Sequence, residues 1–251
     1  MVKLYKGCIY ILFVLLILFI IFIIDNSLEN KKINGLIDDF TSRGVMVEEI
    51  DNYTYYKVTK KYEYEDCSNI CDSYLDINIG TIGDIYISNR DPLGGFFVTE
   101  WISRFSWIGH AGLITSYNGD KMVEIVGNES FKENVVKIND NNWMKIDSDK
   151  HIVLRVKNIS NTDKEKIVEK SNETLGCRYD YTFMFGGNKR FYCTNLVSYI
   201  YKKIDVDLNR DNLFTTGSDM ISNDNTYIIY YKERYIKNNK VCYNIYYLDG
   251  E

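Results

Sequence analysis

The feature of this sequence that most restricts its fold is an uncharged apolar run from Cys8 to Ile24. A helix over these 17 residues would be roughly 25 Å long, and starting it at Leu4 brings it to the roughly 30 Å of a bilayer core. The alternative is a cleaved signal peptide, whose apolar region is usually shorter and leads to a small-residue cleavage site. Because DNSLEN follows Ile24 instead, we expect an uncleaved single-pass membrane anchor over residues 4–24.

Charge sets the expected orientation of this anchor and excludes one class of partner. Lys3 and Lys6 precede the apolar run, and the next basic residues after it are Lys31 and Lys32. The positive-inside rule then places the short N-terminus inside and the rest of the chain outside the membrane. The net charge is −5 and the basic pairs are scattered among acids, so no nucleic-acid partner is expected.

The remainder has a globular composition, with 45% hydrophobic and 26% charged residues in the whole chain. We expect three segments: a membrane anchor over 1–25, a linker or accessory segment over 26–72, and one domain over 73–251. In the middle segment a short helix ends at Gly44, and one or two strands or a stalk follow it. Five strand patterns then occur over residues 84–88, 107–116, 121–127, 135–138 and 151–156.

Two helix patterns follow these strands. Thr162 with Glu165 has the spacing of a capping box, and Gly176 suits a helix stop, which together predict a helix over 163–175. A second helix starts near Cys193, because apolar residues recur there at helical spacing. The tail has the pattern of a closing hairpin. Strands first and helices later predict an α+β fold with an antiparallel sheet packed against a helix pair.

Cys193 is the candidate nucleophile, because a helix N-terminus lowers the pKa of a thiol from its ordinary value of about 8.5. A neighbouring imidazolium would lower this pKa further, and the chain has only two histidines. His151 begins a strand pattern and is interpreted as an exposed edge residue. His110 lies between Gly109 and Ala111, and such small neighbours allow another element to approach. A lone histidine in an apolar strand is more often structural, so His110 needs support from a third group.

Glu124 can supply that third group, depending on the loop that joins the strands of His110 and Glu124. A two-residue Asn-Gly turn pairs Leu113 with Glu124 and places Glu124 on the opposite face from His110. A three-residue loop over 117–119, with Gly119 in the left-handed conformation, pairs Gly112 with Glu124 instead. His110 and Glu124 then share a face as diagonal neighbours. The sequence permits both loops, and only the second builds a Cys–His–Glu triad.

Five motifs in this order give the chain a family resemblance: GDIYIS, W-x-GHAGLI, VEIVG, G-x-x-YDYTFMFG and FYCTNLVSYIY. Over Gly80 to Lys203 the chain resembles the permuted papain-like branch of the NlpC-type cysteine hydrolases, and within it the YiiX-like group. The resemblance implies a permuted papain-like fold with Cys193 as nucleophile, His110 as general base and Glu124 as the residue that orients the imidazole. It further implies hydrolysis of an amide or ester through an acyl-enzyme, without a cofactor.

Three other residues are weaker candidates for substrate binding. Asp180, in RYDYTF, could bind a substrate amine or could be an ordinary turn aspartate. Tyr192 directly precedes the cysteine. Trp107, with Trp101 and Phe105, could line a cleft above His110 or belong to the core.

The remaining cysteines suggest disulfides and no metal site. Five cysteines lie beyond the apolar run, and an odd number fits one unpaired thiol with Cys67–Cys71 and Cys177–Cys242 as possible bridges. Two histidines and a single C-x₃-C do not supply a four-ligand metal set.

Three functions therefore compete. The first is a membrane-anchored cysteine hydrolase that cuts an amide in a peptide-like substrate, for example in the cell wall. The second is a hydrolase or acyltransferase for lipid acyl esters or thioesters with the same nucleophile. The third is a binding module without catalysis, in which Cys193 is a packed residue.

Overall fold

The computed structural model describes residues 13, 17, 24, 27–70, 79–89, 107, 109–127, 133–143, 150–182, 189–210 and 214–249. The expected anchor over 4–24 therefore lies outside the described residues, except at positions 13, 17 and 24. Among the residues that are described, no helix is both long and apolar enough to cross a membrane.

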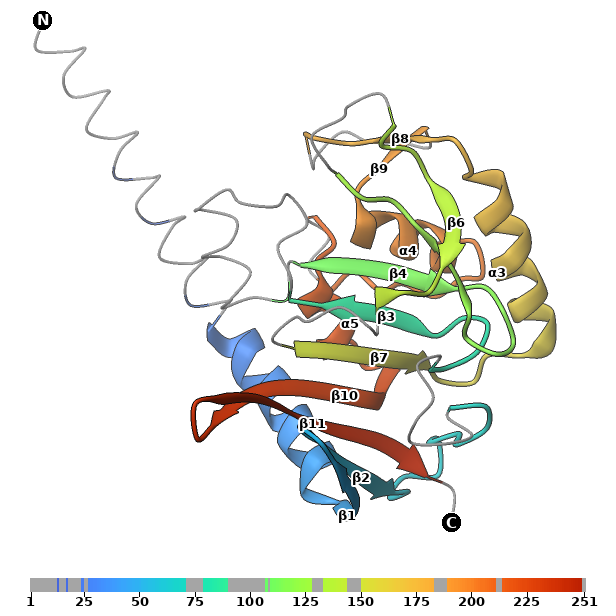
Figure 1. Ribbon diagram of the computed structural model, residues 1–251. Helices are drawn as coiled ribbons and strands as arrows, with labels where there is room; N and C mark the ends of the chain where they lie inside the picture. The colour runs from blue at the N-terminus through green and yellow to red at the C-terminus, as the bar shows by residue number, and fades with distance from the viewer. Residues whose placement is uncertain are drawn as a thin grey trace, which may run out of the picture.

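One nine-stranded sheet forms the centre of the molecule (Figure 1). Its strands, in spatial order, are β1 (Gly44–Ile50), β2 (Tyr53–Thr59), β11 (Lys240–Asp249), β10 (Thr226–Lys237), β7 (Lys150–Val156), β3 (Ile85–Ser88), β4 (His110–Ile114), β5 (Lys121–Glu124) and β6 (Lys137–Asp140). The five expected strand patterns correspond to β3 through β7. The sheet is mixed, because β2 and β11 are parallel while the other neighbours are antiparallel. The expectation of an antiparallel sheet is therefore wrong at this one pair.

Residues from the expected middle segment belong to this same sheet. A helical segment over 27–42 precedes β1, and it buries Ile33, Ile37 and Phe40. β2 then pairs with β11 from the far end of the chain. The division between 26–72 and 73–251 stays a prediction, but the two parts share one continuous hydrogen-bonded sheet.

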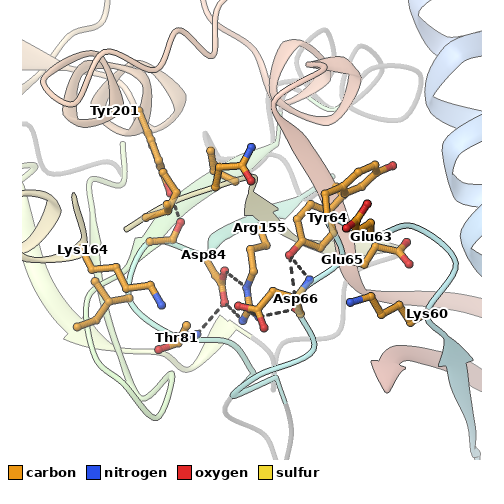
Figure 2. A pocket seen from close by; sticks show the side chains of 16 residues that line it. Lys60, Glu63, Tyr64, Glu65, Asp66, Thr81, Asp84, Arg155, Lys164 and Tyr201 are labelled. Atoms are coloured by element: carbon orange, nitrogen blue, oxygen red, sulfur yellow. Dashed lines mark hydrogen bonds and ion pairs between the residues drawn. The ribbon is translucent and has the colours of Figure 1, made fainter. Parts of the chain in front are cut away.

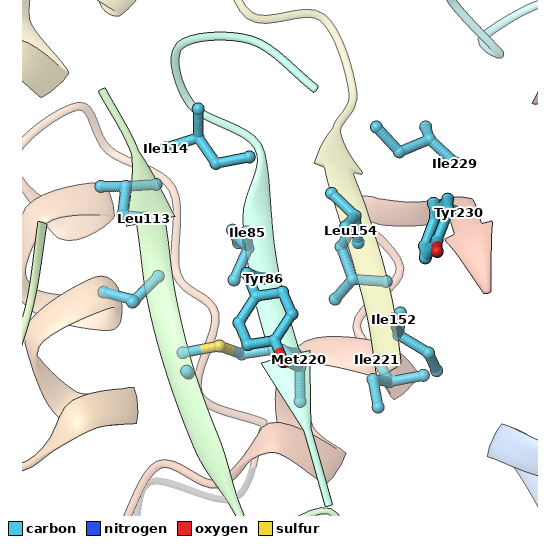
Figure 3. Close-up of a cluster of buried hydrophobic side chains, with 14 of the residues drawn as sticks. Ile85, Tyr86, Leu113, Ile114, Ile152, Leu154, Met220, Ile221, Ile229 and Tyr230 are labelled. Atoms are coloured by element: carbon cyan, nitrogen blue, oxygen red, sulfur yellow. The ribbon is translucent and has the colours of Figure 1, made fainter. Parts of the chain in front are cut away.

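Helices pack against the sheet and complete the α+β fold: α3 (Asn161–Glu173), α4 (Cys193–Lys202) and the short α5 (Gly217–Ser222). α4 packs against β4 and α3, whereas α5 packs against β10. Figure 3 shows Met220 and Ile221 of α5 beside the apolar side chains of the central strands. Because residues alternate between the faces of a strand, Ile85 and Ile87 lie on one face of β3 and Tyr86 and Ser88 on the other, and all four are buried.

The capping box of α3 begins at Ser160, before the expected Thr162. Ser160 is the N-cap, its hydroxyl accepts a hydrogen bond from the Asp163 backbone, and Asp163 in turn accepts from the Ser160 backbone. The expected pair Thr162 and Glu165 was therefore wrong, because the backbone is still extended at Ser160 (φ −79°, ψ 165°) and already helical at Thr162. The closing hairpin of the tail is confirmed, since Asn238 and Asn239 both have positive φ between β10 and β11.

The suggested disulfides are wrong: Cys67, Cys177 and Cys242 all carry free thiols, and Cys71 lies outside the described residues. The Cys177 carbonyl accepts a hydrogen bond from Val136, next to β6, while Cys242 belongs to β11, six strand positions away in the sheet. At about 4.8 Å per strand this separation is roughly 29 Å. A disulfide requires a Cα separation of about 4.4–6.8 Å, so this pair cannot be bridged.

Candidate active site

Cys193 is the first residue of α4, as the sequence predicts. Tyr192 has extended backbone angles and provides the N-cap without a side-chain hydrogen bond. Leu196 and Val197 are fully buried in the next turn, which holds the helix start in place. The Cys193 side chain is itself buried, and its thiol lies 3.8 Å from the carbonyl oxygen of Gly109, directly before β4.

The hairpin of β4 and β5 has the three-residue loop. Leu113 pairs with Val123 and Ile114 with Met122, which places Gly112 opposite Glu124. Gly119 has a φ of +71°, and a Cβ there would lie 2.9 Å from the carbonyl oxygen of Gly80. Glycine is therefore required both by the left-handed turn and by the close backbone, and the prediction that this loop brings His110 and Glu124 to one face is confirmed.

His110 and Glu124 form a direct hydrogen bond between Nε2 and Oε2 at 2.8 Å, and both side chains are almost completely buried. Two further donors hold the carboxylate. The Asn139 side-chain amide donates to Oε1 at 2.8 Å, and the Trp143 indole N–H donates to Oε2. Trp143 also stacks on the imidazole, with ring centroids 4.1 Å apart. The hydrogen bond to Glu124 therefore holds the edge of the imidazole ring, and the stacked indole of Trp143 holds its face.

Asn139 and Trp143 were missed by sequence reasoning. The strand expected over 135–138 ends one residue short of Asn139, whereas β6 continues to Asp140. Because Met122 pairs with Asn139 and Glu124 with Lys137, Asn139 is the diagonal same-face neighbour of Glu124. Extending the register rule from β5 to β6 would have found it. No sequence pattern indicated Trp143.

The hydrogen bond to Glu124 determines which nitrogen of His110 is available. A carboxylate accepts only, so in the neutral imidazole Nε2 carries the proton and Nδ1 keeps its lone pair. Nδ1 is buried and has no hydrogen-bond partner among the residues that the structure describes. Burial alone would lower the pKa of His110, but interactions with Cys193 and Glu124 outweigh it and raise this pKa to about 9.

The pKa of the Cys193 thiol moves in the complementary direction. Burial alone would raise it, but His110 and the backbone N–H groups of Ala111 and Thr194 outweigh burial, so this pKa lies below its ordinary value. The helix dipole adds to the effect. With His110 more basic and Cys193 more acidic, the site favours a thiolate beside an imidazolium.

The other histidine is a structural residue and not the edge residue that the sequence suggested. His151 is fully buried in β7, which is a central strand between β10 and β3. Its Nδ1 makes a short hydrogen bond with the Tyr86 hydroxyl. The edge interpretation was wrong because the C-terminal tail supplies β10 as an outer neighbour.

Two of the weaker candidates, Tyr192 and Asp180, are tied to the start of α4. Asp180 is buried, and its Oδ1 accepts hydrogen bonds from the backbone and hydroxyl of Thr182, which is the turn role considered for it. Its backbone N–H donates to Phe191 of β9 (Arg190–Phe191), which is paired with β8 (Arg178–Tyr179). Burial, the largest effect, raises the pKa of Tyr192 above its ordinary value.

Trp107 is buried within the core cluster, and its backbone N–H donates to Ser218 of α5. Trp101 and Phe105 lie outside the described residues. Within the described ranges, no group of three or more His, Cys, Asp or Glu side chains could hold a metal ion.

The fold and the order of its parts define the class of protein. A histidine-bearing strand comes first and a cysteine-bearing helix later, in an α+β fold of the permuted papain-like type. The model of the family described as permuted papain-like amidase enzyme, YaeF/YiiX, C92 family, matches residues 80–244. This match covers well over half of the chain, so the chain belongs to that family and is a cysteine hydrolase of the amidase class. The resemblance to the YiiX-like group is thereby confirmed.

A solved structure also matches, that of the metalloprotein YiiX from Escherichia coli O157:H7. The two are 17% identical with a TM-score of 0.45, over 59% of this chain and 96% of that one. None of the curated proteins compared with the chain matches it.

Proposed function

We propose that this protein is a cysteine amidase in which Cys193 is the nucleophile, His110 the general base and acid, and Glu124 the residue that orients the imidazole. The observation that carries the proposal is the buried Nδ1 of His110. This nitrogen has no hydrogen-bond partner among the described residues, whereas Nε2 is held by the carboxylate, and the ring as a whole interacts with the Cys193 thiol. This is the tautomer that a base for Cys193 requires.

The reaction begins with the thiolate of Cys193, which attacks the carbonyl carbon of an amide. The oxyanion is stabilised by the Cys193 backbone N–H, because the first N–H groups of a helix have no partner within it. The imidazolium of His110 then gives its Nδ1 proton to the leaving amine as the C–N bond breaks, and a thioester remains. A water molecule, deprotonated by Nδ1, attacks the thioester, and the carboxylic acid leaves as the thiolate is regenerated.

The substrate in this proposal is peptide-like and lies outside the membrane, as cell-wall peptides do. Support comes from the amidase class of the family and from the apolar run over 4–24, which we propose as an anchor with the catalytic domain on the outer side. This scheme requires no cofactor, because the chain itself supplies both the thiolate and the imidazolium.

Labelling of the intact protein tests the proposal directly. An electrophilic peptide probe and an acyl-chain probe of the same reactivity are applied separately at neutral pH, and the modified cysteine is located by mass spectrometry. We expect the peptide probe to label Cys193 at least tenfold faster than Cys67 or Cys242, which are partly exposed and serve as internal controls. His110→Ala should abolish the advantage.

Two results would contradict the proposal in different ways. Equal labelling of Cys193 and Cys242 by both probes would mean that Cys193 is a packed thiol, as in a binding module. Strong preference for the acyl-chain probe would retain the nucleophile but replace the peptide substrate with a lipid ester or thioester.

A further inference from the structure

A cavity of about 330 Å³ (Figure 2) lies at the end of the central strands that is away from Cys193. β3 shows the separation: Ser88 at one end pairs with His110, whereas Asp84, directly before the other end, lines the cavity. The proposed amidase mechanism uses no residue of this cavity. Its size is at the lower end of ligand pockets, which range over about 300–1,000 Å³.

The floor of the cavity is an internally satisfied ion pair. Arg155 donates from Nε and Nη2 to the two oxygens of Asp84, at 2.8 and 2.7 Å. Its Nη1 donates to the backbone carbonyls of Asp66 and Ser68. Since each charge here has a partner, Arg155 and Asp84 shape the floor and leave ligand recognition to the walls.

The walls carry unpaired charges of both signs. Lys60, Glu63 and Lys164 line the cavity, and no side-chain hydrogen bond or ion pair joins them to another residue in the described part of the chain. Figure 2 shows the amino groups of Lys60 and Lys164 approaching the space around Asp66 from opposite sides. Burial alone would raise the pKa of Asp66, but hydrogen bonds from Ser68 and the charges of Arg155 and Lys164 lower it, so Asp66 is a carboxylate at neutral pH.

A buried hydroxyl in the same cavity also lacks a partner. Thr81 lines the cavity with only 1% of its surface exposed, and its hydroxyl has no hydrogen-bond partner among the described residues. Buried polar groups are nearly always hydrogen-bonded. A ligand or ordered water in the cavity would satisfy it.

We propose that this cavity binds a small zwitterion with one ammonium and one carboxylate, of the size of an amino acid or dipeptide. A simple anion would be repelled by Glu63 and Asp66, and a simple cation by the two lysines. A ligand with both charges lets the ammonium face the carboxylates and the carboxylate face the lysines. At about 30 Å³ per water molecule, the cavity holds roughly eleven waters, which is enough for a dipeptide but not for a long chain.

Calorimetric titration of the full-length protein tests this proposal with glycylglycine as the probe. N-acetylglycylglycine lacks the ammonium and glycylglycinamide lacks the carboxylate, so each removes one half of the zwitterion. The titrations are repeated in Cys193→Ala, which separates binding in this cavity from the proposed hydrolysis. We expect glycylglycine to bind both proteins with the same Kd, and each capped form to bind at least tenfold more weakly.

Substitutions in the walls locate the bound ligand. Lys164→Gln and Glu63→Gln should each raise the Kd at least tenfold, and Thr81→Val should raise it severalfold. Lys166→Gln is the matched control, because Lys166 is an exposed residue of the same helix α3 that does not line the cavity, and it should leave the Kd unchanged. Absence of binding, equal binding of the capped forms, or equal Kd values for Lys164→Gln and Lys166→Gln would each overturn the proposal.

Discussion

Replacing Glu124 by glutamine tests how the imidazole is held. The carboxylate accepts three hydrogen bonds, from His110 and Trp143 at Oε2 and from Asn139 at Oε1. A glutamine amide has one oxygen and one NH₂ group, so it cannot accept at both positions. If its oxygen faces His110, its NH₂ group opposes the Asn139 amide. If its NH₂ group faces His110 instead, Nε2 must accept, and the proton moves to Nδ1, where it blocks the base.

The expected magnitude follows from the loss of charge at this contact. Hydrogen bonds to a charged group are worth about 1.5–3 kcal/mol, and the His110–Glu124 pair is almost completely buried. Losing about 1.5–3 kcal/mol of stabilisation of the imidazolium lowers the rate about 10-fold to 150-fold. We therefore expect Glu124→Gln to reduce kcat/KM for amide hydrolysis by this factor without abolishing it, because Cys193 and His110 both remain.

The pH dependence gives a second readout of the same change. In the wild type, the interaction of His110 with Glu124 and Cys193 raises the His110 pKa from 6.5 to about 9. Its contribution to folding stability is therefore fully present below pH 6.5 and is lost as the pH rises through about 9. We expect Glu124→Gln to be less stable than the wild type at pH 7, and the difference in free energy of unfolding to narrow above about pH 9.

Alkylation by iodoacetamide over a pH series measures the thiolate itself. With a weaker imidazolium beside it, the thiolate of Cys193 in Glu124→Gln should form only at a higher pH than in the wild type. Asp140→Asn is the control, because it removes an exposed carboxylate from neighbouring β6. It should change neither kcat/KM nor the alkylation profile of Cys193. Wild-type kcat/KM together with an unchanged alkylation profile in Glu124→Gln would refute the assignment of Glu124.

Three further substitutions test separate parts of the structure. Cys193→Ala should abolish hydrolysis and leave the thermal unfolding midpoint nearly unchanged; retained activity with a large loss of stability would reject the nucleophile. Gly119→Ala should destabilise the fold by at least about 1–2 kcal/mol in chemical denaturation, because a left-handed residue gains a Cβ against the Gly80 carbonyl; an unchanged midpoint would contradict the strained loop. Arg155→Met should cost about 3–5 kcal/mol, since it leaves the buried Asp84 carboxylate without its partner; a loss below about 1 kcal/mol would show that this pair does not hold the end of the sheet.

The parts of the site that lie close together in the sequence could be predicted from it. His110 and Glu124 are joined by one hairpin, so counting residues through a three-residue loop was sufficient to place them on one face. The start of α4 at Cys193 was similarly local, because the apolar spacing that follows it belongs to the same helix. The choice between the two possible loops needed the structure, since Asn118-Gly119 suits both.

The parts that depend on distant segments could not be predicted in this way. His151 was assigned to an edge because its own strand does not encode its neighbours, and β10 arrives from residues 226–237 to cover it. The parallel pair β2–β11 joins residues almost 190 positions apart, such as Asn52 and Val241 at the adjoining turn. A choice between two local signals also failed at α3, where Ser160 and Thr162 both begin a suitable capping pattern.

Trp143 shows why a nonlocal residue can matter as much as the triad that it supports. It contacts two members of the proposed triad at once, stacking on His110 and donating to Glu124. An indole in this position excludes water from the His110–Glu124 hydrogen bond, and in a water-poor environment that bond is stronger. The sequence places Trp143 after β6 with no periodic pattern around it, so only the pairing of β6 with β5 brings it to the site. The basicity of His110 therefore depends on a strand that carries none of the reacting groups.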